Sequence, residues 1–150
     1  MASIKETLYQ LCTDYILERI DAAEKAILAA QESAGDDTKS SAGDKYETGR
    51  EMMQQEINRN RQQLQEAQKL LQVLRNISPD QTHTKIQIGS LAMSNMGNFY
   101  LAISAGQFKV ADQNYFAISM ASPIGRHLAG KSAGEEFQFN GKLFRILEVQ

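Results

Sequence analysis

The chain has 150 residues, of which 42% are hydrophobic, and its formal net charge is −2. That much apolar material can form one or two packed cores and argues against a disordered chain. The slightly acidic balance excludes a protein that binds nucleic acid through excess positive charge alone, because neutralising phosphates requires a surplus of lysine and arginine.

A long amphipathic helix is the first predicted element, beginning after Ser3 and ending near Ser33. Ser3 and Glu6 have the spacing of a capping box, in which two side chains satisfy backbone N–H groups at the helix start. Gly35 is placed to end the helix in a left-handed conformation. Apolar residues recur three or four positions apart and would form one buried stripe. The stripe consists of Leu8, Leu11, Tyr15, Ile16, Ile20, Ala23, Ile27 and Ala30.

Residues 34–47 are predicted to be a turn between two helices. The stretch is rich in Gly, Ser, Asp and Thr, which tolerate turn dihedral angles or hydrogen-bond to their own backbone. A second helix is expected to begin at its end, where Asp44 has the position of an N-cap and Glu47 the position that bonds back to it. This helix would end near Ile77, because Pro79 disfavours the helical conformation in the residue before it.

The second helix has a heptad seam of its own, which favours pairing with the first helix. The polar member of this seam, Asn60, is predicted to fix the register of the pair. Two helices of about thirty residues, rising 1.5 Å per residue, would form a hairpin roughly 45 Å long. Because a single turn connects them, we expect the seam to close within one chain and the protein to be a monomer. The seam consists of Met53, Ile57, Asn60, Leu64, Ala67, Leu71 and Leu74.

The helical pattern stops at residues 78–84. We therefore expect a hairpin domain over residues 1–78, with its tip at 34–47, and a second domain over residues 79–150. The second part consists of short β-prone runs separated by turn-forming pairs, of which Asn140-Gly141 is the strongest hairpin signal. Five or six strands are predicted. The runs lie at residues 86–93, 99–103, 108–110, 115–118, 137–139 and 143–149.

A short helix is expected over residues 123–128, with Ser122 as its N-cap and Pro123 in the first position, where a missing N–H costs nothing. The predicted fold class is α+β: a long antiparallel α-helical hairpin, or coiled coil, followed by a small antiparallel β-sheet domain with one short helix. Aromatic residues on the strands are assigned to the core of the sheet. They are Tyr115, Phe116, Phe137, Phe139 and Phe144.

Several reactive residue types have no partners in the sequence. The one cysteine, Cys12, lies beside the first apolar stripe and is predicted to be a small core residue. His83 and His127 lack further ligands at metal-binding spacing, and Ser90 and Ser122 lack a histidine and an acid in any motif. We find neither a basic segment followed by an apolar one at the N-terminus nor a run of about eighteen apolar residues, and we expect a cytoplasmic protein without a membrane span.

Three segments point to one family. Residues 122–136 contain Ser-Pro-Ile, then Gly-Lys, then Gly followed by two acidic residues, and residues 88–91 read Ile-Gly-Ser-Leu. Near the predicted turn, Gly35-Asp36 is followed by Tyr46 and by Arg50-Glu51. These segments and their order resemble Gre-type (GreA/GreB) bacterial transcription elongation factors over nearly the whole chain. The resemblance implies an FKBP-like second domain.

The resemblance also implies a function. Such a protein binds bacterial RNA polymerase at the secondary channel through its C-terminal domain and reaches the active centre with the hairpin tip. Asp36 and Asp37 would help to hold a second Mg²⁺ shared with the polymerase, which cuts backtracked RNA. The chain would have no catalytic residue of its own and would contact nucleic acid only through the polymerase complex. The implied docking residues are Ser122, Pro123, Ile124, Gly130 and Lys131.

Asp44 and Glu47 are further carboxylates near the tip and second candidates for the same role. Helix capping and turn chemistry explain these acids equally well, so both interpretations stay open. We do not expect the free protein to bind a metal, because Asp36 and Asp37 lack the alternating spacing of a calcium loop. Polar contacts with RNA phosphates or polymerase carboxylates are assigned to residues that otherwise form a solvated face. These are Lys39, Lys45, Tyr46 and Arg50.

Three functions remain open at this point. The stretch Thr38-Lys39-Ser40-Ser41 differs from the family's tip, so cleavage stimulation competes with a cleavage-incompetent regulator that occupies the same channel. The third possibility is a structural coiled-coil module whose seam pairs between chains. A stand-alone enzyme has no support, because no constellation of nucleophile, base and oxyanion donor is present.

Overall fold

The computed structural model describes residues 2–37 and 43–150, with side chains described for residues 2–33 and 49–150. Within these residues two long helices are followed by a six-stranded sheet and one short helix, which confirms the α+β fold class. The helices are α1 (Ile4–Asp37), α2 (Gly43–Arg75) and α3 (Pro123–Leu128). The strands are β1 (Leu91–Ser94), β2 (Gly97–Leu101), β3 (Gly106–Val110), β4 (Gln113–Ile118), β5 (Glu136–Phe139) and β6 (Lys142–Val149).

The helix ends confirm one sequence prediction and correct two. Ser3 Oγ accepts the backbone N–H of Glu6 at 3.1 Å, as the capping box requires. However, α1 continues through Gly35 to Asp37. In addition, α2 begins at Gly43, so Asp44 lies inside the first turn and is not the N-cap. The predicted turn at 34–47 is therefore too long, because each added helical residue gains a backbone hydrogen bond that outweighs a Gly or Asp penalty of at most about 1 kcal/mol.

The chain packs as two compact units. Residues 16–71 form the hairpin unit, and residues 1–15 together with 72–150 form the sheet unit. The sheet unit therefore contains the first turns of α1 and the last residues of α2. The division at residues 78–79 that the sequence suggests stays a prediction.

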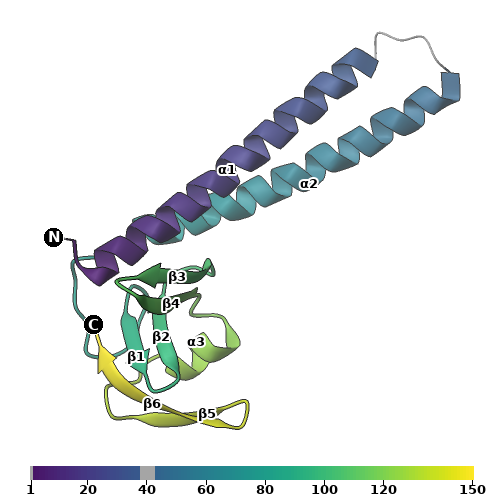
Figure 1. Ribbon diagram of the computed structural model, residues 1–150. Helices are drawn as coiled ribbons and strands as arrows, with labels where there is room; N and C mark the ends of the chain where they lie inside the picture. The colour runs from purple at the N-terminus through teal and green to yellow at the C-terminus, as the bar shows by residue number, and fades with distance from the viewer. Residues whose placement is uncertain (1, 38–42) are drawn as a thin grey trace. The chain divides into compact units, whose positions relative to one another are not determined.

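In the hairpin unit, α1 and α2 run side by side in opposite directions (Figure 1). Every residue of the two predicted apolar stripes is buried or half-buried, which confirms the register of both. Asn60 Nδ2 donates to the carbonyl of Glu56 in its own helix at 3.0 Å, so the predicted register-fixing contact across the seam is not seen among the described residues. Asn60 instead lines a hollow of about 320 Å³ between the helices, whose other lining residues are Arg19, Ala22, Ala23, Ala26 and Gln63.

The sheet has the strand order β3-β4-β2-β1-β6-β5. Four of its neighbouring pairs are antiparallel, but β2 and β4 are parallel, with Phe99 opposite Phe116. The expectation of a purely antiparallel sheet is wrong at this pair, because the chain first adds β3 at the outer edge and then returns between β3 and β2. The predicted hairpin turn is confirmed: Asn140 and Gly141 connect β5 and β6 with φ values of 54° and 76°.

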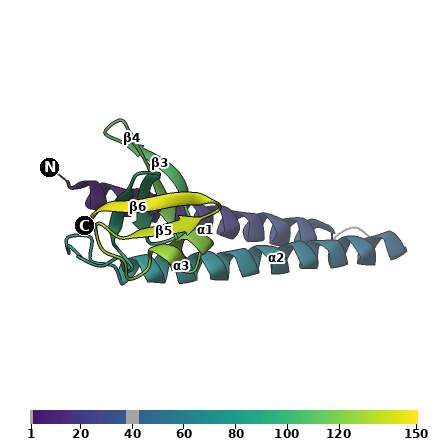
Figure 2. The ribbon, with the colours of Figure 1, turned by 90° about the horizontal axis from the view of Figure 1, so that it is seen from below.

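The two faces of the sheet have different covers within the sheet unit. One face packs on α3 and carries the main core, which contains Phe99, Leu101, Leu128 and Ile146. On the other face, Leu91 pairs with Tyr100, and both are fully buried. Cys12 and Tyr9 in the first turns of α1 lie close enough to Tyr100 to raise the pKa of its hydroxyl further, although burial is the larger cause. Figure 2 shows the strands and α3 from a second direction.

Candidate docking site

The start of α3 is held rigidly by its cap. Ser122 Oγ accepts the backbone N–H of Gly125 at 3.1 Å and donates to the carbonyl of Ser119 at 2.7 Å. Pro123 occupies the start of the helix, and both sequence predictions for this helix are confirmed. Ser122 thus stabilises the helix end and ties it to the loop after β4.

Gly125 is a residue that the sequence reasoning missed. A Cβ atom at this position would lie 2.2 Å from the carbonyl oxygen of Ser119 and 2.8 Å from Ser122 Oγ. The first of these neighbours is backbone and cannot move aside as a flexible side chain does. Only glycine allows α3 to approach this loop so closely, so Gly125 is as much a part of the helix start as Ser122.

Gly130 and Lys131 join α3 to the segment before β1. Ile86 donates its N–H to the carbonyl of Lys131 at 2.8 Å, and its own carbonyl accepts the N–H of Gly130 at 2.8 Å. Gly130 has a φ of 77°, in the left-handed region that favours glycine. The Lys131 ammonium lies 5.4 Å from the centroid of the Phe137 ring, within cation–π range.

An apolar groove opens beside the start of α3, and we call it the aromatic groove. It has a volume of about 330 Å³ and is built from β1–β2, β4, α3 and the β5–β6 hairpin. Met96 and Phe116 are 40% and 37% exposed, so the groove presents apolar surface to solvent. Of the predicted docking residues, Ile124 lines it directly. The lining consists of Met96, Phe99, Phe116, Ile124, Phe139, Asn140, Lys142 and Phe144.

The groove partly corrects the assignment of the aromatic residues to the core. Tyr115 and Phe144 are buried, whereas Phe116 is exposed and Phe139 is half-buried. The adjacent residues Tyr115 and Phe116 point to opposite faces of β4, because side chains alternate along a strand. Two aromatic residues in succession on one strand were a signal in the sequence that they lie on opposite faces and cannot both belong to the same core. Met96, Asn140 and Lys142 gave no such signal.

The hairpin end is described only by its backbone. Asp36 and Asp37 form the last two residues of α1, and Asp44, Lys45, Tyr46 and Glu47 lie in the first turns of α2. Their side chains, and Lys39 altogether, lie outside the described residues. Arg50 is exposed on α2.

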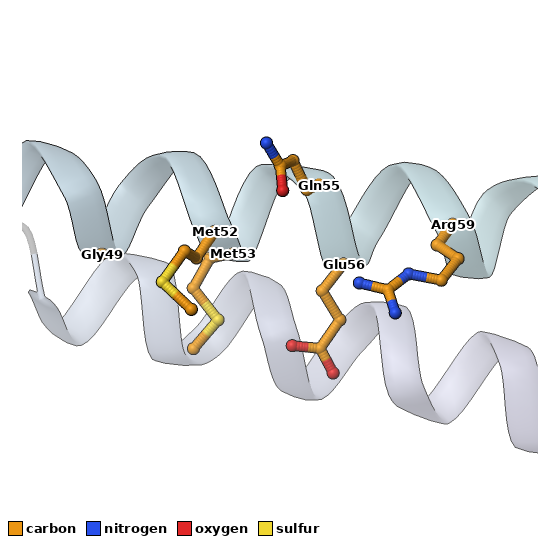
Figure 3. Close-up of a pocket in the computed structure, with 6 residues that line it drawn as sticks. All are labelled: Gly49, Met52, Met53, Gln55, Glu56 and Arg59. Atoms are coloured by element: carbon orange, nitrogen blue, oxygen red, sulfur yellow. The ribbon is translucent and has the colours of Figure 1, made fainter.

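Next to this end, α2 lines a hollow of about 400 Å³. In Figure 3 the side chains of Met53 and Glu56 extend from α2 toward the α1 ribbon. Met52 is 65% exposed, and a Cβ atom at Gly49 would have no neighbour within 4 Å. The hollow is therefore a loosely filled part of the hairpin and not a formed pocket. Its lining residues are Gly49, Met52, Met53, Gln55, Glu56 and Arg59.

A buried polar cluster lies at the base of the sheet unit. Lys5 is 4% exposed, and its Nζ donates to the carbonyl of Gln81 at 2.5 Å. His83 Nδ1 lies 2.8 Å from the hydroxyl of Ser90, which also accepts the N–H of Gln87 at 3.0 Å. Burial lowers the pKa of Lys5, and burial together with the Lys5 charge lowers the pKa of His83. These groups join the first turn of α1 to the segment before β1 and play a structural part.

The remaining predicted residues show no chemistry of their own. Cys12 is fully buried, and burial raises the pKa of its thiol to about 12, which confirms the prediction of a core residue. Among the side chains of residues 2–33 and 49–150, no three His, Cys, Asp or Glu side chains gather as a metal site. No helix in the described part of the chain is long and apolar enough to cross a membrane.

Comparisons with known proteins found similarity to solved structures. No protein-family model matches the chain, and no curated protein matches it. A solved structure described as that of the transcription factor Gfh1 is similar with a TM-score of 0.38 and 17% sequence identity. The similarity covers 91% of this chain and 92% of that one.

Proposed function

We propose that the chain is a Gre-like transcription factor that binds bacterial RNA polymerase at the secondary channel and acts at the active centre through the end of its hairpin. The observation that carries the proposal is the position of the predicted docking segment. Ser122 caps α3, Pro123 starts it, and Ile124 lines the aromatic groove. The segment that resembles the Gre signature is thus preorganised beside a groove in which Phe116 is partly exposed.

The two compact units have separate roles in this proposal. The sheet unit supplies affinity, because an exposed apolar groove with rigid walls is the kind of surface that binds a partner side chain. The hairpin unit supplies reach. Helix α1 ends in two successive acidic residues, Asp36 and Asp37, which we propose it carries to the active centre of the polymerase. A helix can do so because its backbone hydrogen bonds are satisfied within the helix.

The end of α1 suits a cation. Asp36 and Asp37 form the last two residues of the helix, where the partial negative charge of the helix C-terminus adds to that of the carboxylates. Mg²⁺ prefers oxygen ligands and is commonly bound by one or two protein carboxylates together with water and phosphate. When shared with a polymerase, the ion would supply the activation of water and the stabilisation of charge on phosphate. The chain itself is proposed to bring the carboxylates and to stabilise their position.

Two experiments test the proposal. Binding to core RNA polymerase is measured by fluorescence anisotropy with labelled full-length protein, with and without an excess of a known secondary-channel factor. We expect competition. Ile124→Ser should weaken binding about tenfold or more through loss of apolar contact, whereas Leu147→Ser, at an exposed position outside the groove lining, should not. Unchanged binding by Ile124→Ser, or no competition, would count against docking at this site.

The second experiment uses a backtracked elongation complex. Asp36→Asn together with Asp37→Asn should leave polymerase binding within about twofold and abolish release of the 3′ RNA fragment, because the amides cannot replace charged metal ligands. If the wild-type protein binds but releases no fragment at any Mg²⁺ concentration, the protein is instead the cleavage-incompetent regulator. That alternative uses the same docking site.

The structural coiled-coil module is the less supported alternative. It requires an apolar seam that is free to pair with the seam of a second chain. In the structure every residue of both stripes is already buried or half-buried within a single chain. Sedimentation at micromolar concentration should therefore show a monomer, and a tight dimer would favour the module.

A further inference from the structure

The aromatic groove has walls that are formed before any partner arrives. The rings of Phe99 and Phe116 stack with centroids 5.8 Å apart, and Phe139 meets Phe144 edge to face at 6.2 Å. Phe99 and Phe144 belong to the buried core of the sheet unit, so the floor of the groove cannot collapse without disturbing that core. A partner would therefore bind without paying for ordering of the site, which favours a well-defined anchor residue.

The charged side chain in the lining of the groove is basic. Lys142 lines it, and neither Lys142 nor Lys131 forms an ion pair among the residues that the structure describes. His127 stacks on Phe137 with centroids 5.5 Å apart and meets Phe139 edge to face at 5.3 Å. Lys131 lies over the same Phe137 ring. Lys142 thus supplies a positive charge in the groove lining itself, whereas His127 and Lys131 lie beside aromatic rings of the neighbouring strand β5.

The nearby carboxylates are already engaged within the chain. Glu135 accepts the backbone N–H of Ser132, and Glu136 forms an ion pair with Arg145 at 2.5 Å. The charge of Glu136 is thus compensated by Arg145, whereas Glu135 keeps its charge. In a chain with a net charge of −2, the lysine in the groove lining is a local feature and not a consequence of composition.

We propose that the aromatic groove binds a protein segment with an apolar anchor residue flanked by carboxylates. The anchor fills the space between Phe116, Phe139 and Ile124, and a flanking carboxylate meets Lys142. Apolar burial supplies affinity, and the charges supply orientation and faster association. The inference rests on the proposed function only for the identity of the partner, which would then be the polymerase.

A single strand of nucleic acid is a second candidate for the groove, because its phosphates are anionic and its bases can stack on aromatic rings. The groove suits it less well than an acidic peptide. Binding a single strand requires a basic track along several nucleotides together with open ring faces for stacking. Here one lysine lies in the lining, and the rings of Phe99, Phe139 and Phe144 pack on one another. A short acidic peptide matches the size and charge of the groove better than a phosphate backbone.

The test needs no polymerase. Random dodecapeptides displayed on phage are selected on the immobilised full-length protein, and the enriched sequences are synthesised with a fluorescent label. We expect enrichment of Leu, Ile, Met or Phe next to Asp or Glu. Anisotropy should then show binding that weakens about tenfold or more in Lys142→Glu and in Phe116→Ser. The charge-matched control, Lys69→Glu on the hairpin unit, should bind as the wild type does.

The outcomes separate the two proposals. The inference is wrong if no peptide is enriched or if the enriched peptides lack acidic residues. It is also wrong if Lys142→Glu and Lys69→Glu bind the peptide equally well. Displacement of the labelled peptide by a twelve-nucleotide oligo(dT) at a lower concentration than by unlabelled peptide would favour nucleic acid instead. Circular dichroism of Phe116→Ser verifies its fold, and Lys142→Glu tests the charge independently of it. If the groove binds acidic peptides but the protein fails to bind polymerase, the proposed function fails and this inference stands.

Discussion

The hairpin unit and the sheet unit are held together by different means. Among the large side chains that are fully buried in the described residues, Ile16 is the one that belongs to the hairpin unit, and the others belong to the sheet unit. The other buried hydrophobic residues among the described side chains of the hairpin unit are Ala23, Ala30, Ile57 and Ala67, and hollows of about 320 and 400 Å³ lie along this unit. The sheet unit instead interlocks aromatic rings around Phe99 and Phe144.

The difference indicates how each unit serves the proposed function. A helix satisfies its backbone hydrogen bonds internally, so a hairpin can extend from a protein with a thin and loosely filled seam. A docking surface requires side chains at fixed positions, and only a densely packed core supplies them. We therefore expect substitutions in the core of the sheet unit to cost more stability than those in the seam of the hairpin unit.

The largest expected effect compares one residue type in both units. Ile146→Ala removes a fully buried side chain from the sheet core and should cost about 3–5 kcal/mol of the free energy of unfolding. Ile57→Ala, in the seam of the hairpin, should cost about 2 kcal/mol, the low end for such a change, because a seam between two helices offers fewer side chains to contact than the sheet core does. Urea unfolding followed by circular dichroism measures both. Equal losses would show that the seam is as well packed as the core.

Two glycines give a second comparison. Gly125→Ala should destabilise the sheet unit by about 2 kcal/mol or more, because the new methyl group meets the carbonyl oxygen of Ser119. Thermal unfolding should show a lower Tm.

Gly49→Ala is the matched control in the hairpin unit. Gly49 lies in α2, and a Cβ atom there has open space, so the substitution should stabilise the helix by up to about 1 kcal/mol. A loss of stability at Gly49, or none at Gly125, would contradict the difference between the units.

A third prediction concerns the buried hydroxyl of Tyr100, which has no hydrogen-bond partner among the described residues. Tyr100→Phe removes a polar group whose desolvation costs about 1–3 kcal/mol and leaves the ring in place. We expect unchanged stability or a gain of about 1 kcal/mol, measured by urea unfolding. A clear loss would show that a water molecule bonds this hydroxyl.

The smallest expected effect is a pH dependence in the sheet unit. The pKa of His83 is lowered in the folded protein by burial and by Lys5, so the unfolded chain binds more protons below about pH 6.5. The contribution of neutral His83 is therefore present above that pH and is lost as the pH falls through its lowered pKa. Wild-type protein and His83→Asn are compared by urea unfolding between pH 8 and pH 5. The wild type should lose more stability over this range, and parallel curves would contradict the assignment.

Local signals in the sequence determined much of this protein. The two apolar stripes, the Ser3 and Ser122 caps and the Asn140-Gly141 turn depend on residues within a few positions of one another, and the structure confirms each of them. The helix ends at Asp37 and Gly43 were missed, because Gly and Asp weaken a helix without deciding where it stops.

Tertiary structure alone decided the aromatic groove. The aromatic groove joins Met96 to Phe144, and their proximity depends on the strand order and on the parallel pairing of β2 with β4. The need for glycine at position 125 arises from a loop carbonyl six residues earlier in the chain, at Ser119, that only the packed α3 approaches. Such contacts are set by how elements pack. Along the strands, the neighbours of the groove residues point to the other face of the sheet, so no continuous run in the sequence marks the groove.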